Sequence, residues 1–168
     1  MELCKSLMNH GYSKDKKSYE YRHDTMGLNF RMTDIQAAIA RVQLKKLDSY
    51  VEHRNKVASI YKDEFKNING ISVQEFGNDY KSNYFFFGIL VDENKRDELV
   101  NKLIERGVMV KTWTSVHAQP LWNHQFIKSP EYFNNAENIS NSVILLPIHN
   151  TITEQEVEYV IQNVKELI

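Results

Sequence analysis

The sequence predicts an α/β protein of the α+β kind, in which a small sheet is covered by helices and preceded by one long helix. Three observations predict this class. Apolar residues recur at helical spacing from Ile35 to Phe65, and no glycine or proline interrupts them. After Gly70, short apolar runs alternate with amphipathic segments, as strands and covering helices do. Two capping boxes mark where helices begin.

The long helix is predicted over residues 33–69. Thr33 is a suitable N-cap, and Gln36, three residues later, completes a capping box. At 1.5 Å per residue, a helix of ~30 residues is roughly 50 Å long. Because this length exceeds the interior of a small compact domain, we interpret the segment as a helix that joins two domains.

Residues 70–168 are predicted to form a small C-terminal domain. Its strands are expected at residues 71–73, 83–91, 108–114 and 143–146, and Pro147 ends the last of them. One helix begins near Asp92 and ends at Gly107, and a short helix opens at Ser129-Pro130. The last helix begins at the capping box of Thr153 and Glu156. The predicted apolar faces carry Leu99, Val100, Leu103 and Ile104 in the first helix, and Val157, Val160, Ile161, Val164 and Ile168 in the last.

The composition is that of an ordinary globular domain, with 42% hydrophobic and 26% charged residues in a chain of 168. The net charge of -1 gives no electrostatic reason to expect nucleic acid or a membrane surface as a partner. No apolar run approaches the ~20 residues of a membrane-spanning helix. The single cysteine, Cys4, excludes an intramolecular disulfide and is typical of a reducing cytoplasm. We therefore expect a cytoplasmic protein.

The N-terminal region has a different character. Residues 13–25 are polar and have no clear period, which predicts an exposed loop or a loop that needs a partner. We expect residues 1–32 to be mobile, because a segment with few buried contacts opens at little cost in free energy.

The segment Gly27-Leu28-Asn29-Phe30-Arg31-Met32 brings an amide and a guanidinium together just before the capped helix. This segment resembles the G-x-N-x-R-M motif of the DegT/DnrJ/EryC1/StrS family of pyridoxal-phosphate (PLP) sugar aminotransferases, in which a helix rich in Ala and Gln-Leu follows. Further segments resemble the family in order and spacing. They are Leu7-Met8-Asn9-His10-Gly11, Gly107-Val108, Val116-His117-Ala118-Gln119-Pro120-Leu121-Trp122 and Leu145-Leu146-Pro147-Ile148-His149.

The resemblance implies the C-terminal part of an aspartate-aminotransferase-type (fold type I) enzyme whose sites form between two subunits. It implies that residues 1–32 reach into the neighbouring subunit, where Asn29 contacts the cofactor phosphate and Arg31 lies near the phosphate or the substrate. An amide donor beside a guanidinium suits a dianionic phosphate. The resemblance also implies that His117 and Gln119 lie at the rim of the nucleotide-sugar pocket. An isolated loop histidine, by contrast, is more often simply exposed or hydrogen-bonded.

The Schiff-base lysine of the family follows a strand and precedes a Gly-rich turn. None of the lysines here has that context, and Lys111 is the only one on a predicted strand. We therefore expect that the lysine and the cofactor-binding domain lie before residue 1, that this chain contains no catalytic residue, and that it binds no PLP alone. The six histidines show no metal-ligand spacing, so no metal is expected.

Two hypotheses about function remain. In the first, the chain is the C-terminal domain of a PLP-dependent nucleotide-sugar aminotransferase and is inactive when isolated. Such an enzyme moves an amino group from glutamate to a keto-deoxysugar nucleotide for surface polysaccharide or glycan biosynthesis. Its expected partners are a second copy of the chain, a large-domain chain and the nucleotide sugar. In the second, the chain is a non-catalytic fragment of a split or truncated gene that acts as an assembly or binding module.

Overall fold

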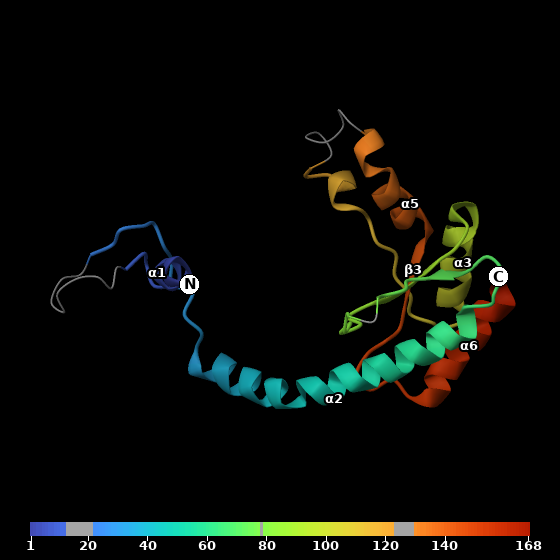
Figure 1. The fold of residues 1–168 in the computed structure, drawn as a ribbon, viewed down its shortest axis with the longest axis horizontal. Helices are drawn as coiled ribbons and strands as arrows, with labels where there is room; N and C mark the ends of the chain where they lie inside the picture. Colours follow the sequence, from blue (N-terminus) through green and yellow to red (C-terminus); the bar gives the residue numbers. More distant parts are fainter. Residues whose placement is uncertain (13–21, 78, 123–129) are drawn as a thin grey trace. The chain divides into compact units, whose positions relative to one another are not determined.

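The computed structural model of the chain describes residues 1–12, 22–77, 79–122 and 130–168 (Figure 1). These residues form two compact units, Met1–Leu47 and Asp48–Ile168. Helix α2 (Asp34–Phe65) begins in the first unit and ends in the second. Most of the predicted polar loop at 13–25 lies outside the described residues, as does Ser129, where a helix was predicted to open.

The first unit is organised by close backbone contacts. Helix α1 (Glu2–Met8) is followed by a turn in which Gly11 has a φ of 76°. Isolated bridges then pair Asn9 with Asn29 and Tyr12 with His23. A Cβ on Gly27 would clash with the Gly11 nitrogen, and one on Gly11 would clash with the Thr25 carbonyl oxygen. Both positions therefore require glycine, because the two backbones touch there.

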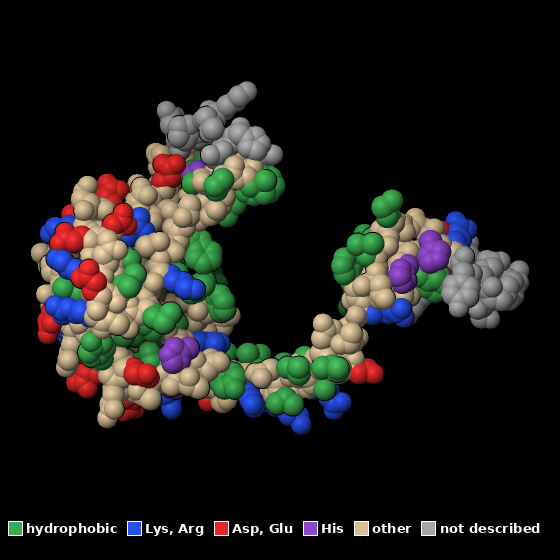
Figure 2. All heavy atoms as spheres, turned by 180° about the vertical axis from the view of Figure 1, so that it is seen from behind, with side chains coloured by type: hydrophobic (Ala, Val, Ile, Leu, Met, Phe, Trp, Pro, Cys, Tyr) green, Lys and Arg blue, Asp and Glu red, His purple; other side chains and the backbone are tan. Residues whose placement is uncertain are grey.

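The predicted capping box at the start of α2 is confirmed. The Thr33 N–H donates to Gln36 Oε1 at 2.9 Å, and the Gln36 N–H donates to Thr33 Oγ1 at 3.3 Å. In this half of the helix the large apolar residues are exposed, and 75% of Ile35 is accessible. Figure 2 shows them along one side of the helix, with lysine and arginine on another. Among the described residues, no apolar side chain before Val57 is buried.

We expect the chain to self-associate through this apolar side of α2, because exposed apolar patches usually bind a partner. Replacing both Ile35 and Ile39 by lysine should weaken the association, since the substitutions place charge where apolar surface is buried. Analytical ultracentrifugation of both chains at high micromolar concentration checks this prediction. A monodisperse monomer for the unsubstituted chain would contradict it.

The second half of α2 supplies one wall of the hydrophobic core of the second unit. Val57, Ala58, Tyr61 and Phe65 are buried. The Tyr61 hydroxyl donates to the Pro147 carbonyl at 2.9 Å, and burial raises the pKa of this phenol. The helix ends at Phe65, within the predicted span of 33–69. The chain turns there, since the Ile68 N–H donates to the Phe65 carbonyl and Gly70 has a φ of 92°.

Within the described residues, the sheet has three antiparallel strands in the order β1-β2-β3. They are β1 (Ser72–Val73), β2 (Phe87–Leu90) and β3 (Val143–Leu146). Phe87 pairs with Leu146 and Ile89 pairs with Ile144, so these four buried residues share the core face. The Phe87 and Tyr61 rings lie 5.1 Å apart between centroids, which joins the sheet to α2.

Two predicted strands differ from the observed ones. The strand predicted at 83–91 is ordered as a strand only from Phe87. Tyr84 has a φ of 42°, and the Asn83 side chain accepts from the Phe85 N–H, so the chain turns before the strand. The segment 108–114 makes one isolated bridge, between Lys111 and Leu145, instead of forming a strand.

The hydroxyl of Ser140 explains why pairing stops after Lys111. It donates to the Trp113 carbonyl at 2.8 Å and accepts from the Ser115 N–H at 3.2 Å. The backbone groups that would continue a ladder are therefore bonded to a side chain. Side chains still alternate along this segment, since Val108 and Val110 are buried while Met109 between them is exposed.

Helix α3 (Glu93–Glu105) begins at an Asp92 cap, and Gly107 follows its end with a φ of 79°. Both features were predicted. Leu99 and Leu103 are fully or nearly fully buried, but Ile104 is 53% exposed, so its predicted place on the buried face is wrong. The apolar stripe of α3 is narrower than the sequence suggests, because Leu99 and Leu103 are buried in the core, Val100 is only partly buried against it, and Ile104 lies outside it.

Three further elements of the second unit follow later in the chain. The 3₁₀ turn η2 (Pro130–Phe133) leads directly into α5 (Asn134–Ser142). Helix α6 (Glu154–Leu167) starts with the predicted capping box, and the Thr153 N–H that donates to Glu156 holds the pKa of that carboxyl below its usual range. The residues predicted for its stripe are buried, apart from Ile168. Of the helices that the structure describes, none is both long enough and apolar enough for a bilayer crossing.

Candidate functional site

The first unit presents the predicted amide and guanidinium as one group. Asn29 Oδ1 accepts from Arg31 Nε at 3.1 Å and from the Arg31 backbone N–H at 3.4 Å. Both residues are exposed. The Phe30 N–H donates to the Met8 carbonyl and the Leu28 N–H to the Leu7 carbonyl, so α1 and the following turn hold the loop on both sides of Asn29.

Both side chains keep N–H donors that the bonds between Asn29 and Arg31 do not use. Arg31 occupies the acceptor of Asn29, Oδ1. Asn29 Nδ2 and the terminal guanidinium nitrogens of Arg31 make no hydrogen bond to other described residues. A set of donors without a competing acceptor fits a phosphate group. The residues present are therefore compatible with the phosphate of PLP.

The second unit holds His117 in the 3₁₀ turn η1 (Val116–Ala118). Its Nε2 lies 3.1 Å from Glu137 Oε1, and its ring stacks on Phe133 with centroids 4.3 Å apart. Only 11% of the His117 side chain is exposed. A carboxylate can only accept, so Nε2 carries the hydrogen of this pair, and a neutral imidazole then offers Nδ1 as an acceptor.

An apolar cavity of about 480 Å³ lies against His117. Its walls come from η1, from the residues before it, and from η2 and α5. They include Trp113, Val116, Phe133, Ile139 and Val143. Gln119, the other predicted substrate residue, is exposed, and its Nε2 donates to the Thr114 carbonyl at 3.4 Å. The structure places His117 and Gln119 in one turn but gives their side chains different partners.

Sequence reasoning missed Glu137 and Phe133, which fix the His117 ring. A signal for this wall exists in α5 and the first residue of β3. Ala136, Ile139, Ser140 and Val143 follow one another at helical spacing, and all four line the apolar cavity. The stripe is inconspicuous because it includes a serine and an alanine, and asparagines surround it.

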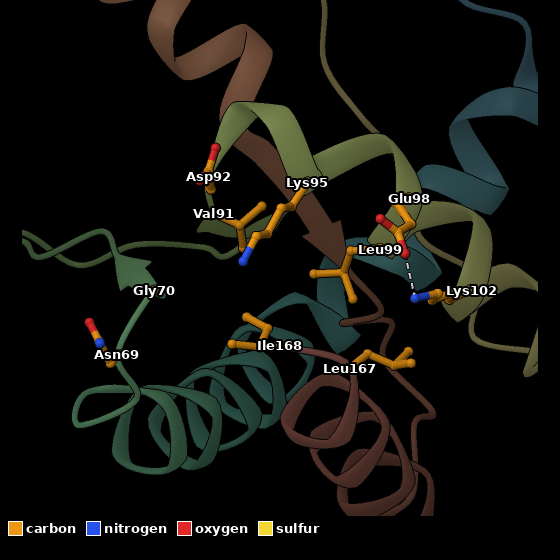
Figure 3. A pocket seen from close by; sticks show the side chains of 10 residues that line it. All are labelled: Asn69, Gly70, Val91, Asp92, Lys95, Glu98, Leu99, Lys102, Leu167 and Ile168. Carbon is orange, nitrogen blue, oxygen red and sulfur yellow. Dashed lines mark hydrogen bonds and ion pairs between the residues drawn. The ribbon is translucent and has the colours of Figure 1, made fainter.

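A second pocket of about 480 Å³ lies where the turn at Gly70, α3 and the end of α6 meet (Figure 3). It contains none of the predicted site residues. Its acidic groups already have partners, since Glu98 pairs with Lys102 and Asp92 caps α3. We assign it no role. The described residues hold no group of three or more His, Cys, Asp or Glu that could bind a metal ion.

Comparison with known proteins identifies the family. The sequence profile of the DegT/DnrJ/EryC1/StrS aminotransferase family matches residues 1–165. The chain belongs to this family, as the motifs around Asn29 and His117 predicted. Dependence on PLP is general in the family.

The chain spans less than half the length of the individual relatives that it matches. The chain is 32% identical to an uncharacterised protein of Methanocaldococcus jannaschii, over 99% of this chain and 46% of that protein. It is 31% identical to GDP-perosamine synthase of Escherichia coli O157:H7, over 88% of this chain and 39% of the enzyme.

The fold is shared with solved aminotransferases. The aminotransferase TlmJ of Streptoalloteichus hindustanus superposes with a TM-score of 0.85, over 98% of this chain and 44% of that chain, at 24% identity. The predicted fold class is confirmed, since this match and others like it lie in the C-terminal part of fold type I sugar aminotransferases.

Proposed function

We propose that this chain is the C-terminal part of a PLP-dependent nucleotide-sugar aminotransferase that moves an amino group from glutamate to a keto-deoxysugar nucleotide. The observation that carries the proposal is the Asn29–Arg31 pair, held with its remaining donors exposed, in a chain that belongs to a sugar aminotransferase family. The name of one relative, GDP-perosamine synthase, indicates that this relative makes a nucleotide sugar.

In this proposal Asn29 and Arg31 bind the phosphate of PLP held by a neighbouring subunit. When bound, PLP supplies an electron sink for moving the amino group. Asn29 keeps the Arg31 side chain in place through the 3.1 Å bond to Nε, and the guanidinium offsets the charge of the phosphate. Residues 1–32 are then the segment that crosses between subunits, 33–69 the helix that joins the domains, and 70–168 the small domain.

His117 and Gln119 bind the nucleotide sugar in this proposal. Glu137 holds the proton on Nε2 of His117 and thereby presents Nδ1 as an acceptor for a sugar hydroxyl. The Phe133 ring, parallel to the imidazole within 14°, restrains its tilt.

Activity requires the large domain that supplies the covalent attachment of PLP, and we propose that this chain binds no PLP alone. Its partners are a second copy of the chain, the large domain and the nucleotide sugar. The exposed thiol of Cys4 is consistent with a reducing compartment, and we place the protein in the cytoplasm.

The test combines this chain with the large domain of a homologous enzyme and measures glutamate-dependent amino transfer to nucleotide sugars. Transfer that needs both parts supports the proposal. A chain that assembles with the large domain but supports no PLP binding and no transfer would instead favour the non-catalytic assembly module.

In the same assembly, His117→Ala is expected to raise the KM for the nucleotide sugar about three- to tenfold. The reason is the loss of one hydrogen bond, worth about 0.5–1.5 kcal/mol. Affinity for PLP should not change. His149→Ala is the matched control, because His149 is exposed and its ring hydrogen-bonds to the Thr151 hydroxyl instead of facing the apolar cavity. An unchanged KM in His117→Ala would remove this residue from the substrate site.

A further inference from the structure

A polar cavity of about 360 Å³ lies next to the apolar cavity in the second unit. It includes neither His117 nor Phe133. Its walls come from α3, from the extended segment before η1, and from α5. The polar side chains that line it include Arg96, Thr112, Thr114, Ser115, Glu137 and Asn141.

Arg96 brings a shielded positive charge to this cavity. Only 15% of its side chain is exposed. Its Nε forms an ion pair with Asp97 Oδ1 at 2.7 Å, and this buried Nε makes no hydrogen bond to the described residues. The Asp97 side chain is 82% exposed, and water screens its charge. A guanidinium shielded to this extent is costly without a well-placed partner.

Ser115 adds a second polar atom with the same property. Its Oγ is buried and has no hydrogen-bond partner among the described residues, while its backbone N–H is fixed by Ser140. Within the described ranges, Arg96 Nε and Ser115 Oγ are the two buried side-chain atoms left without a hydrogen bond, and both residues line this cavity. Buried polar atoms are almost always satisfied, so this coincidence points to a bound group.

The chemistry of the walls selects an anion. The guanidinium fork of Arg96 matches two oxygens of a carboxylate or a phosphate, and the hydroxyls of Thr112, Thr114 and Ser115 can donate to the rest. Glu137, the acidic residue on the wall, directs Oε1 to His117. We propose that this cavity binds a small oxyanion, the phosphate or carboxylate group of a small molecule, through the Arg96 guanidinium and the Ser115 hydroxyl.

The volume allows more than the oxyanion. A cavity of about 360 Å³ falls in the range of roughly 300–1,000 Å³ that small-molecule sites occupy. The oxyanion can therefore carry a small organic group. The site does not depend on the assignment of Asn29, Arg31 or His117, none of which lines it.

The test uses the 168-residue chain and two probes, inorganic phosphate and acetate, titrated at constant ionic strength set with sodium chloride. The readout is the thermal unfolding midpoint, which rises when an anion binds the folded state. The variants are Arg96→Met and Ser115→Ala. Lys95→Met is the matched control, because Lys95 is the preceding residue of α3, is exposed, and lines the other pocket (Figure 3).

We expect phosphate, acetate or both to raise the midpoint of the unsubstituted chain and of Lys95→Met alike. Arg96→Met should weaken the binding at least about tenfold and Ser115→Ala a few-fold, as expected for one charged and one neutral hydrogen bond. The probe that binds tells a phosphate site from a carboxylate site. In NMR spectra of the unsubstituted chain, the chemical shift of the Arg96 Nε–H should change during the same titration. This measurement keeps the proposal testable if Arg96→Met does not fold.

Two results would overturn the proposal. If neither anion changes the midpoint or the Arg96 signal, the cavity is occupied by water. If both anions stabilise Arg96→Met and Lys95→Met equally, their effect is that of a salt on the whole surface.

Discussion

Leu103→Ala should lower the free energy of unfolding of the second unit by about 2–5 kcal/mol, which is the usual cost of this truncation at a fully buried site. Leu103 has no exposed surface and lies in the core cluster with residues from α2, the sheet and α6. The substitution removes apolar contacts and leaves a cavity that a close-packed core fills only in part. Such a loss is a large fraction of the stability of a domain.

Ile104→Ala is the control for this prediction. Ile104 is the next residue on α3 and is largely exposed, so its truncation should change the free energy of unfolding by only about 0.5 kcal/mol. Urea unfolding followed by circular dichroism measures both variants. Equal losses for the two substitutions would contradict the assignment of the buried face of α3.

Arg31→Ala should weaken PLP binding to the assembled enzyme by roughly one to two decades. The residue would donate charge-assisted hydrogen bonds to the phosphate, and such bonds are worth about 1.5–3 kcal/mol. A difference of ~1.4 kcal/mol changes affinity tenfold. Titration of the chain and large-domain assembly with PLP measures the effect. Arg22→Ala is the matched control, since Arg22 is an exposed arginine of the same unit that is paired with Asp24.

Two further variants sharpen this test. Arg31→Lys keeps the charge but loses the fork, so its affinity should fall between those of Arg31→Ala and the unsubstituted chain. Asn29→Ala should weaken PLP binding by more than the loss of one amide donor would, because Asn29 Oδ1 also accepts from Arg31 Nε and positions that side chain. The double substitution should therefore cost less than the sum of the two single ones. Unchanged affinity in Arg31→Ala would remove the phosphate role of this loop.

Features with a strong local signal could be predicted from the sequence. The capping boxes at Thr33 and Thr153 depend on side chains three residues apart, and both form. The end of α3 at Gly107 likewise depends on the conformational freedom of one residue. The Asn29–Arg31 pair was found because its members are two positions apart in a recognisable motif.

Features decided by distant contacts could not be predicted. The segment after Lys111 has the alternation of a strand, but a hydroxyl from α5, at Ser140, takes the backbone groups that a neighbouring strand would need. The partner of His117 is 20 residues away on a helix that sequence reasoning located only approximately. The role of Ile104 was misjudged because helical spacing alone does not fix the width of the buried face.

Helix α2 has a consequence for how its own first half stays helical. Forming the first turn of a helix is unfavourable, while each added residue extends a helix at little cost. The buried half, with Tyr61 and Phe65 in the core, supplies the nucleus, and the half that begins at the Thr33 cap grows from it. The Asn29–Arg31 loop is thus connected to a helix that is nucleated far along the chain, and the helical order next to this loop is inherited from the aromatic core around Tyr61.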